Sequence, residues 1–594
     1  MVAIDPSGRG STPPRARKLF RIPHRLRAFV RADETWLVVV AGFVGVTAGC
    51  FVALMVATVQ WLHHVLFAIE GHEVSGAAFI DPWRAALVPA VGGIILGLIG
   101  WLATRNSRIP IIDPVEANAL HGGRIPMKGS LLLVLQTMVS NGFGASIGME
   151  AGYTQIGSAF ASCLGQLFHV RRSDLRTLVG CGAAGAIAAA FDAPLTGAFY
   201  AFELIISTYS IATLAPVIVA SIAAVGTMRL LFPQESFQVG FAGTLTGSDY
   251  ALVFMMALVS AVVAIVMMRT VTLVEVVFSK SRLPVWMRPT IGGLCVGGLA
   301  LITPTVLSSG HSALHVGFGA YYTAPVLVMF IGLKVLASAI SIGSGFRGGL
   351  FFASLFLGAM LGKLVALGWM LVFGLKIPGL VVAIVGMCAM ATAVLGAPLT
   401  MAFLALETTG SLPLTIAVLA AAVVSSITVR RLFGYSFATW RFHLRGESIR
   451  SAADIGWIRD LSVGKMMRKD VRTAPEDAEL SRLRRDFPLG AAQRVTVADN
   501  EGRYVGIILV PEIHQDLSEG ATATDLVRFA DIALLPGMNV REAMKAFSTA
   551  EADALAVVNN SAERKIIGLL TEQHALRRYN EQLDRRQNEG NPYT

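Results

Sequence analysis

Glu150 is an acidic residue in a long apolar stretch, within the segment GASIGMEAGYTQIG that includes Gly148 and Gly152. A carboxylate in such a segment is costly to bury and usually has a function. The glycines let the chain turn, so a helix that begins here would present unpaired amides, which attract anions. A tethered carboxylate could occupy that anion site until a mobile anion displaces it. The structural alternative is that Glu150 only complements the dipole of its own helix.

Two more glycine-rich segments precede apolar runs. They are HGGRIP, at His121–Pro126, and GSGFRGGLFFA, at Gly343–Ala353. Such breaks are common in membrane helices, so each one alone is weakly informative. Three helix starts of this kind beside one buried glutamate predict an anion site built from backbone amides.

Two segments of the sequence are repeated about 200 residues later. APLTGAFYAFE (Ala193–Glu203) and APLTMAFLALE (Ala397–Glu407) are identical at eight of eleven positions, and GMEAGYTQIG (Gly148–Gly157) has a counterpart in GLFFASLFLG (Gly349–Gly358). The offsets of 204 and 201 residues nearly agree. Duplicated halves with broken helices are typical of transporters that hold a solute near the middle of the bilayer. The alternative is a pair of unrelated Ala/Gly-rich packing faces.

The composition favours a membrane protein. Of 594 residues, 54% are hydrophobic and only 15% are charged, against roughly 25% in a soluble domain. The charges concentrate in residues 1–35 and 441–594, which predicts an all-α polytopic membrane domain between them. The net charge of +10 does not indicate nucleic-acid binding, because the N-terminal arginines precede the first span and fit the positive-inside rule. We expect a multi-pass inner-membrane protein with both termini in the cytosol.

Twelve apolar segments are expected, with breaks at Gly122-Gly123, Gly148, Pro194, Gly343 to Gly349 and Pro398. Amides freed at such breaks cannot face lipid, so they are expected to face protein or a conduction path. The segments lie near 36–63, 83–104, 128–146, 150–170, 178–206, 210–232, 250–278, 288–308, 325–342, 349–374, 378–395 and 397–430.

The C-terminal residues 447–594 have the composition of a soluble domain. The order helix, strand, turn, strand, helix is predicted over 463–513, with the turn at Asp499 to Gly502. A weaker copy follows over 531–576. This spacing resembles a tandem pair of cytosolic CBS modules, at about 461–516 and 525–580, and an unrelated small α/β tail is the alternative.

Taken in order, the membrane motifs resemble those of the CLC family of chloride channels and transporters. The family's GSGIP motif matches Gly122–Pro126, its GxEGP motif matches Gly148–Gly152, and its GxFxP motif matches Gly349–Ala353. Its FNAPLAG-type segment is similar to Phe191–Gly197.

The resemblance spans about residues 36–446, with halves of about 36–232 and 250–440, and the CBS pair extends it. It implies an inverted internal repeat, a homodimer in lipid with one pore per subunit, and Glu150 as the gate. The implied anion-binding residues, mostly through their backbone, are Gly122, Gly123, Ile125, Met149, Glu150, Ala151, Leu350, Phe351 and Phe352.

Two hydroxyl groups of the family are replaced in this chain. Gly123 stands at the position of the central-site serine, and Ala438 stands at the position of the inner-gate tyrosine. Each missing hydrogen bond would weaken anion binding by about 1.5–3 kcal/mol unless water substitutes. A more open inner vestibule is therefore expected.

The resemblance also bears on proton coupling. Glu203 matches the first of two acids at the end of the APLxG helix, and Leu204 occupies the position of the second, which relays protons in exchangers. Because an apolar side chain cannot carry a proton, the sequence favours passive conduction. A proton or water path and a structural role at a helix end are both open for Glu203, whereas the structural role is favoured for Glu407.

The ribose-contacting Ser/Thr-x-x-Asp pattern of CBS modules is incomplete, since the segment that begins at Thr571 lacks the aspartate. A structural or dimer-stabilising role is favoured, and an adenine nucleotide contacting Thr571 remains an option. No other cofactor and no metal site are expected.

These features predict transport of chloride or a similar small anion through a channel-like path gated by Glu150. No catalytic triad or P-loop indicates an enzyme. One alternative is a proton–chloride antiporter of the same family. A divalent-cation transporter with CBS regulation would need clustered intramembrane carboxylates, and a nucleotide sensor with a membrane anchor would not need over 400 residues of broken helices.

Overall fold

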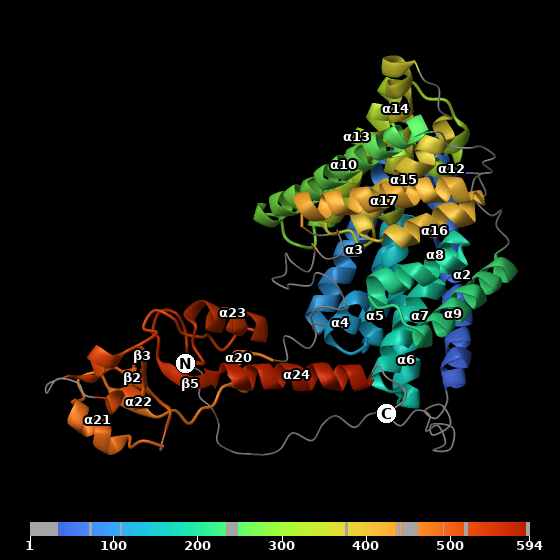
Figure 1. Cartoon of the computed structure of the whole chain (residues 1–594). Coiled ribbons are helices and arrows are strands. Elements are labelled where there is room, and N and C mark those ends of the chain that lie inside the picture. Colours follow the sequence, from blue (N-terminus) through green and yellow to red (C-terminus); the bar gives the residue numbers. More distant parts are fainter. Residues whose placement is uncertain are drawn as a thin grey trace.

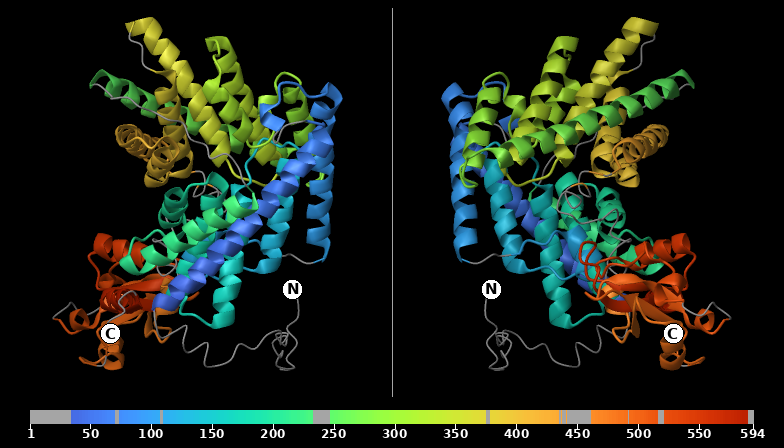
Figure 2. Two further views of the ribbon diagram at one scale, coloured as in Figure 1. Left: turned by 90° about the vertical axis from the view of Figure 1, so that its right-hand side faces the viewer. Right: turned by 90° about the vertical axis from the view of Figure 1, so that its left-hand side faces the viewer.

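The structure is a computed structural model that describes residues 34–69, 74–106, 110–232, 247–374, 378–434, 436, 440, 461–490, 492–515 and 521–589. Eight helices in these ranges are long and apolar enough to cross a membrane. The longest, α2 (Glu34–Phe67) and α10 (Gly247–Lys280), have 34 residues each. A straight helix of that length measures about 51 Å, well over the ~30 Å hydrocarbon core, so both are long enough to cross it at a tilt. Figure 2 shows α2, in blue, running diagonally.

The other helices of the membrane region are α3 (Pro82–Asn106), α4 (Pro114–Leu120), α5 (Met127–Gly142), α6 (Glu150–Phe168), α7 (Arg172–Phe191), α8 (Pro194–Tyr200), η2 (Ala201–Ile206), α9 (Ile211–Leu231), α11 (Arg288–Ala300), α12 (His311–Gly319), α13 (Ala324–Ser344), α14 (Phe351–Phe373), α15 (Gly379–Leu395), α16 (Pro398–Thr409) and α17 (Leu412–Leu432), with the short turns η1 (Val74–Gly76) and η3 (Pro304–Val306).

The predicted helix breaks are confirmed. Pro194 and Pro398 each begin a helix as its first residue, where the missing N–H of proline costs nothing. The segment predicted over 397–430 contains one more break, because Gly410 adopts a left-handed conformation (φ 64°) that ends α16 before α17 starts. Glycine takes this conformation without steric cost.

The two halves of the membrane region repeat each other and meet at α8 and α16, which lie side by side in Figure 1. Two extended residues join them. The Gly148 N–H donates to the Gly349 carbonyl (2.9 Å), and the Gly349 N–H donates back to the Gly148 carbonyl (3.0 Å). The duplicated sequence thus produces duplicated structure, and equivalent residues of the two copies bind each other.

Glu203 and Glu407, which end the two copies of the repeated segment, make a second reciprocal contact. Glu407 accepts hydrogen bonds from Leu195 N (2.7 Å), Thr196 N (2.8 Å) and Thr196 Oγ1 (2.7 Å) at the start of α8. Glu203 accepts the equivalent three bonds, at 2.9, 2.8 and 2.7 Å, from the start of α16. Each carboxylate therefore pairs the orphan amides of the opposite half.

Glycines let neighbouring helices in each half approach closely. A Cβ on Gly157 in α6 would overlap the carbonyl of Gly182 in α7, and a Cβ on Gly358 in α14 would overlap the carbonyl of Gly386 in α15. The same small-residue contact thus occurs in both halves, as is usual for helix packing in membranes.

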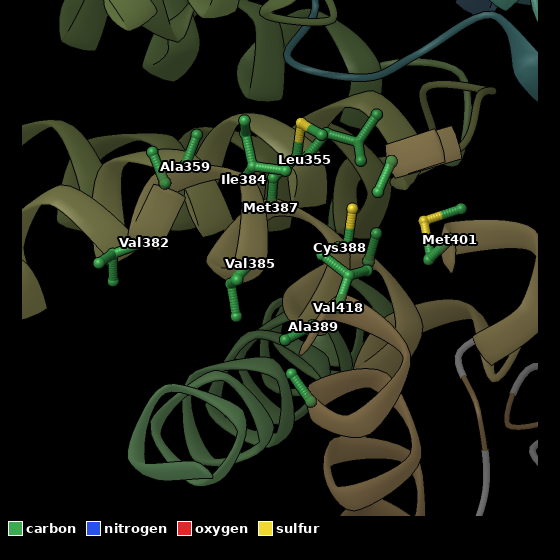
Figure 3. Packing of buried hydrophobic residues seen from close by; sticks show 14 of the residues in the cluster. Leu355, Ala359, Val382, Ile384, Val385, Met387, Cys388, Ala389, Met401 and Val418 are labelled. Carbon is green, nitrogen blue, oxygen red and sulfur yellow. The ribbon is translucent and has the colours of Figure 1, made fainter. Parts of the chain in front are cut away.

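The largest buried apolar cluster lies in the second half. It includes Leu355 and Ala359 on α14, which lie beside Ile384 and Met387 on α15, and Val418 on α17 (Figure 3). Lipid is as apolar as these side chains, so packing rather than water exclusion holds the helices together.

The C-terminal region forms two small α/β units, as predicted. Its elements are α20 (Val463–Met466), β1 (Thr473–Pro475), α21 (Leu480–Asp486), β2 (Arg494–Ala498), β3 (Tyr504–Leu509), α22 (Val510–Ile513), η4 (Ala523–Leu526), α23 (Val540–Ala550), β4 (Ala554–Val558), β5 (Ile566–Thr571) and α24 (Glu572–Glu589).

The first sheet has the order β1-β2-β3, and the second pairs β4 with β5. Leu534 adds a parallel bridge to Val557, as β1 does to β2 in the first sheet, so the units share one plan, consistent with a CBS pair. The predicted turn lies between β2 and β3, where Arg503 donates to Asp499 (2.7 Å) and lowers the pKa of that carboxyl.

The glycine contacts generate a stability prediction. Replacing Gly358 with alanine should destabilise the protein by about 1–3 kcal/mol, because the added methyl forces two helices apart. Gly368→Ala in the same helix is the control, since a Cβ there meets nothing within 4 Å. Thermal denaturation in detergent measures both, and equal midpoints for the two variants would contradict this packing.

The two carboxylates that cap helices of the opposite half, Glu203 and Glu407, generate a second stability prediction. Glu407→Gln should destabilise the protein by about 1.5–3 kcal/mol, since hydrogen bonds to a charged group are lost. Glu203→Gln should cost a similar amount, because its contacts are the same in kind. The control is Glu275→Gln, an exposed glutamate on α10. An unchanged melting midpoint in both cap variants would exclude a structural role for these carboxylates.

Candidate functional site

Two helix starts face each other in the middle of the membrane region. α6 begins at Glu150 with Met149 as its N-cap, and α14 begins at Phe351 with Leu350 as its N-cap. Neither cap residue supplies a side-chain hydrogen bond to its helix. The first amides of an α-helix have no backbone partner within the helix, so amides at both starts need an acceptor from elsewhere.

Serine hydroxyls hold the two loops that precede these helices. Ser146 N donates to Ser341 Oγ (3.0 Å), and Ser146 Oγ lies 3.2 Å from Ser338 Oγ. Arg347 N donates to Ser140 Oγ (3.1 Å). Together with the Gly148–Gly349 pair, these bonds fix the loops to each other, and the helix starts converge as a result.

Glu150 occupies the space where the helix starts meet. The residue is 4% exposed, and its Oε1 accepts a hydrogen bond from Phe352 N at 2.7 Å. Its Oε2 is buried and has no hydrogen-bond partner among the described residues. The glutamate of one half thus binds a backbone amide of the other half.

The glycines beside Glu150 make room for its carboxylate. A Cβ on Gly148 would overlap both carboxylate oxygens, and a Cβ on Gly349 would lie 2.6 Å from Oε2. A side chain at either position would therefore displace the Glu150 carboxylate from its present place.

The structure brings together six of the predicted site residues around two cavities. Glu150, Ala151, Leu350 and Phe351 line a cavity of about 230 Å³. Met149 and Phe352 line a smaller one of about 40 Å³, with His63 and His311 in its wall. The Phe352 ring stacks on Phe191 with 4.4 Å between ring centroids.

The predicted residues of the HGGRIP segment are engaged elsewhere. Gly122 and Gly123 form a turn with positive φ, the Gly123 carbonyl accepts from Ser162 Oγ (2.6 Å), and Ile125 N donates to Ser162 Oγ (3.0 Å). None of the three lines either cavity. Their contact with an anion stays a prediction.

The remaining predicted positions have varied environments. Ala438 lies outside the described residues. Glu203 caps α16, so its carboxylate is already bound, and a proton path through it stays a prediction. Thr571 Oγ1 accepts from His574 N (3.3 Å) at the start of α24, and its contact with a nucleotide also stays a prediction.

Two polar residues of interest, Asp113 and Tyr200, were not identified from the sequence. They line the larger cavity beside Glu150. The Asp-Pro pair at the start of α4 is a helix N-cap signal, and it could have located Asp113. Lys334, for which the sequence indicates no role, donates to the carbonyls of Thr305, Val306 and Ser308.

A divalent-cation site finds no support in the described ranges, where no three His, Cys, Asp or Glu side chains gather closely enough to hold a metal ion. The carboxylate at the centre instead meets backbone amides, which are donors, so the centre is suited to an anion.

Comparison with known proteins agrees with this geometry. The family described as voltage gated chloride channel matches residues 111–430. The voltage-gated ClC-type chloride channel ClcB of Escherichia coli O81 (strain ED1a) is 31% identical over 408 residues, which cover 66% of this chain and 95% of that protein.

Two solved structures share the fold. One, described as a slow cyanobacterial Cl⁻/H⁺ antiporter, has a TM-score of 0.61 at 22% identity. The match covers 69% of this chain and 97% of the antiporter chain. The other, described as a eukaryotic CLC transporter, has a TM-score of 0.57 at 18% identity. The match covers 92% of this chain and 98% of the transporter chain. The second match extends over the C-terminal units as well. This chain is therefore a multi-pass membrane protein of the CLC family, whose members are channels or transporters and not enzymes.

Proposed function

We propose that this protein transports chloride or a similar small anion across the membrane, with Glu150 as a protonatable gate. The anion would lose its water shell between the starts of α6 and α14, where backbone amides replace it. Ionised Glu150 occupies that place, and protonated Glu150 leaves it to the anion. The anion-transporting CLC family and the chloride named for the ClcB relative support this assignment.

One observation carries the proposal. The Glu150 carboxylate accepts a hydrogen bond from Phe352 N at the uncapped start of the opposite helix. A carboxylate and a chloride ion are both anions that such amides attract. Because the carboxylate is tethered to α6 and its Oε2 has no hydrogen-bond partner among the described residues, a mobile anion can compete with it.

Channel-like conduction and exchange for protons both use this gate. Channel-like conduction is the simpler mode, since Leu204 is apolar and Glu203 is held as a cap. Proton-coupled exchange is the second candidate, and it is supported by the fold shared with a protein described as a Cl⁻/H⁺ antiporter.

We further propose a homodimer in lipid with one anion path per subunit, in an inner membrane with cytosolic termini. The exposed apolar side chains Leu412, Ile416 and Ile427 on α17, and Ile222 on α9, supply a face that a second copy or lipid would cover. Chemical cross-linking in the membrane distinguishes a dimer from a monomer.

Replacing the gate tests the proposal. Glu150→Ala should conduct chloride at all pH values, and Glu150→Gln should behave as a permanently protonated gate. The hydrogen bond to a charged group contributes about 1.5–3 kcal/mol, so removing it should shift the occupancy of the site by roughly 10- to 150-fold. Chloride efflux from liposomes at pH 4.5 and 7.5 measures the change.

Wild-type protein should release chloride faster at pH 4.5 than at 7.5, because protonation neutralises the competitor of the anion. Glu275→Gln is the matched control and should keep that dependence. A folded Glu150→Ala variant that passes no chloride, or that retains the pH dependence of the wild type, would disprove the gate.

A further inference from the structure

A third cavity lies at the end of two membrane-spanning helices. Its volume is about 730 Å³, and it is lined by residues of α3, α5, α10, the start of α11 and the loop that precedes α14. The apolar spans of α3 and α10 end at Ala103 and Lys280. Ala103 and Ser279 both line the cavity, which places it where the hydrocarbon core of a bilayer meets the polar headgroups.

Two tryptophans of the cavity wall support this placement. Trp101 on α3 and Trp286 in the loop before α11 line the cavity and are exposed. The Arg105 guanidinium lies over the Trp101 ring, with 5.1 Å from its Cζ to the ring centroid. Tryptophan is enriched at membrane–water interfaces, because its ring is apolar and its N–H is polar. The cavity therefore opens among lipid headgroups.

The polar part of the wall carries a positive charge. Arg288 and Arg347 line the cavity, and Glu275 is the single acid among the described lining residues. Arg288 donates to the carbonyls of Leu283 at 3.3 Å and Ser279 at 3.5 Å, which are long hydrogen bonds. No described carboxylate forms an ion pair with it. Its guanidinium therefore keeps its charge for an anionic ligand, and phosphate matches the planar donors of arginine.

The remainder of the wall is mostly apolar. Leu96 on α3, Val285 before α11 and Phe346 before α14 belong to it. Gly100 on α3 also lines the cavity, and a Cβ at this position would meet nothing within 4 Å. Open space thus lies beside α3 within reach of the charged residues, so the cavity suits a ligand with a polar and an apolar part.

These features favour a lipid over the other occupants. The cavity is much larger than those of about 230 and 40 Å³ beside Glu150, and a small anion would not contact its apolar wall. A second copy of the chain is not favoured, because no described residue of α9 or α17, the face proposed for the dimer, lines the cavity. The two arginines outweigh Glu275, which favours a lipid with a net negative charge.

We propose that an anionic phospholipid binds in this cavity, with its phosphate on the Arg288 guanidinium and an acyl chain along α3 beside Gly100. Ile111 and Arg347 line both this cavity and the one that contains Glu150. The bound lipid therefore contacts a wall that the two cavities share. This site goes beyond the proposed anion transport, and lipid binding is measured without any flux.

The test follows the melting midpoint of the full-length protein in detergent as dioleoyl phosphatidylglycerol is added. A ligand that binds only the folded state raises the midpoint as its concentration increases. Phosphatidylglycerol should raise it more than dioleoyl phosphatidylcholine, which has the same chains and no net charge. Inorganic phosphate should have no effect, because it has no acyl chain.

Two variants locate the effect in the cavity. Arg288→Gln should need about tenfold more phosphatidylglycerol for the same increase, since it loses a hydrogen bond from a charged group. The matched control is Arg282→Gln, an exposed arginine between α10 and α11 that does not line the cavity, and it should respond as the wild type does. Gly100→Leu should fill the space beside α3, keep the lipid-free midpoint and reduce the response to that seen with phosphatidylcholine.

Three results would overturn the lipid site. They are equal responses to the two lipids, equal responses of Arg288→Gln and Arg282→Gln, and a midpoint increase with inorganic phosphate as large as with phosphatidylglycerol, which would indicate a simple anion site. If Arg288→Gln fails to fold, Gly100→Leu decides, and a wild-type response of that variant excludes the site. None of these results bears on the proposed transport function.

Discussion

Helix starts inside a membrane leave backbone amides without partners, and the structure depends on how they are satisfied. Water cannot reach most of them, and lipid offers no acceptor. Here the starts of α8 and α16 are capped by Glu407 and Glu203, each with three hydrogen bonds. The starts of α6 and α14 meet at Glu150, whose Oε1 accepts a hydrogen bond from Phe352 N. Backbone amides at helix starts thus bind three carboxylates. Glu407 and Glu203 are held by three hydrogen bonds each, and Glu150 is held by the bond from Phe352 N.

This difference in bonding separates structural from functional carboxylates. Removing a carboxylate that satisfies three donors leaves all of them unpaired, which costs stability. A carboxylate with one oxygen without a partner can be replaced by a mobile anion at smaller cost. Glu203 and Glu407 each bind the opposite half through three hydrogen bonds, and Glu150 lies at the same interface, where the proposed gate would require it to leave.

Close helix packing is what allows the amides to converge. Gly157 and Gly182 in one half, and Gly358 and Gly386 in the other, bring helix backbones together where any side chain would overlap. Gly148 and Gly349 leave room for the carboxylate in the same way. Glycine in this protein therefore sets the distances between helices as well as the turns.

The sequence by itself determined the membrane class, the duplication, most helix breaks and the importance of Glu150, because each of these is a local pattern of apolar runs, glycines, prolines and one isolated acid. It also predicted the two paired strands of each C-terminal unit, but it missed β1, which divides the predicted first helix into α20 and α21. It did not predict the break at Gly410, since glycine within an apolar run is common in membrane helices.

Only the tertiary structure decided which amides and acids meet. The reciprocal caps join residues about 200 positions apart, and the sequence left two roles open for Glu203 because nothing local shows its partner. Asp113 lies on the same cavity as Glu150 only because α4 and α6 fold against each other. Contacts across the two halves are set by packing, and residue type and spacing along the chain do not encode them directly.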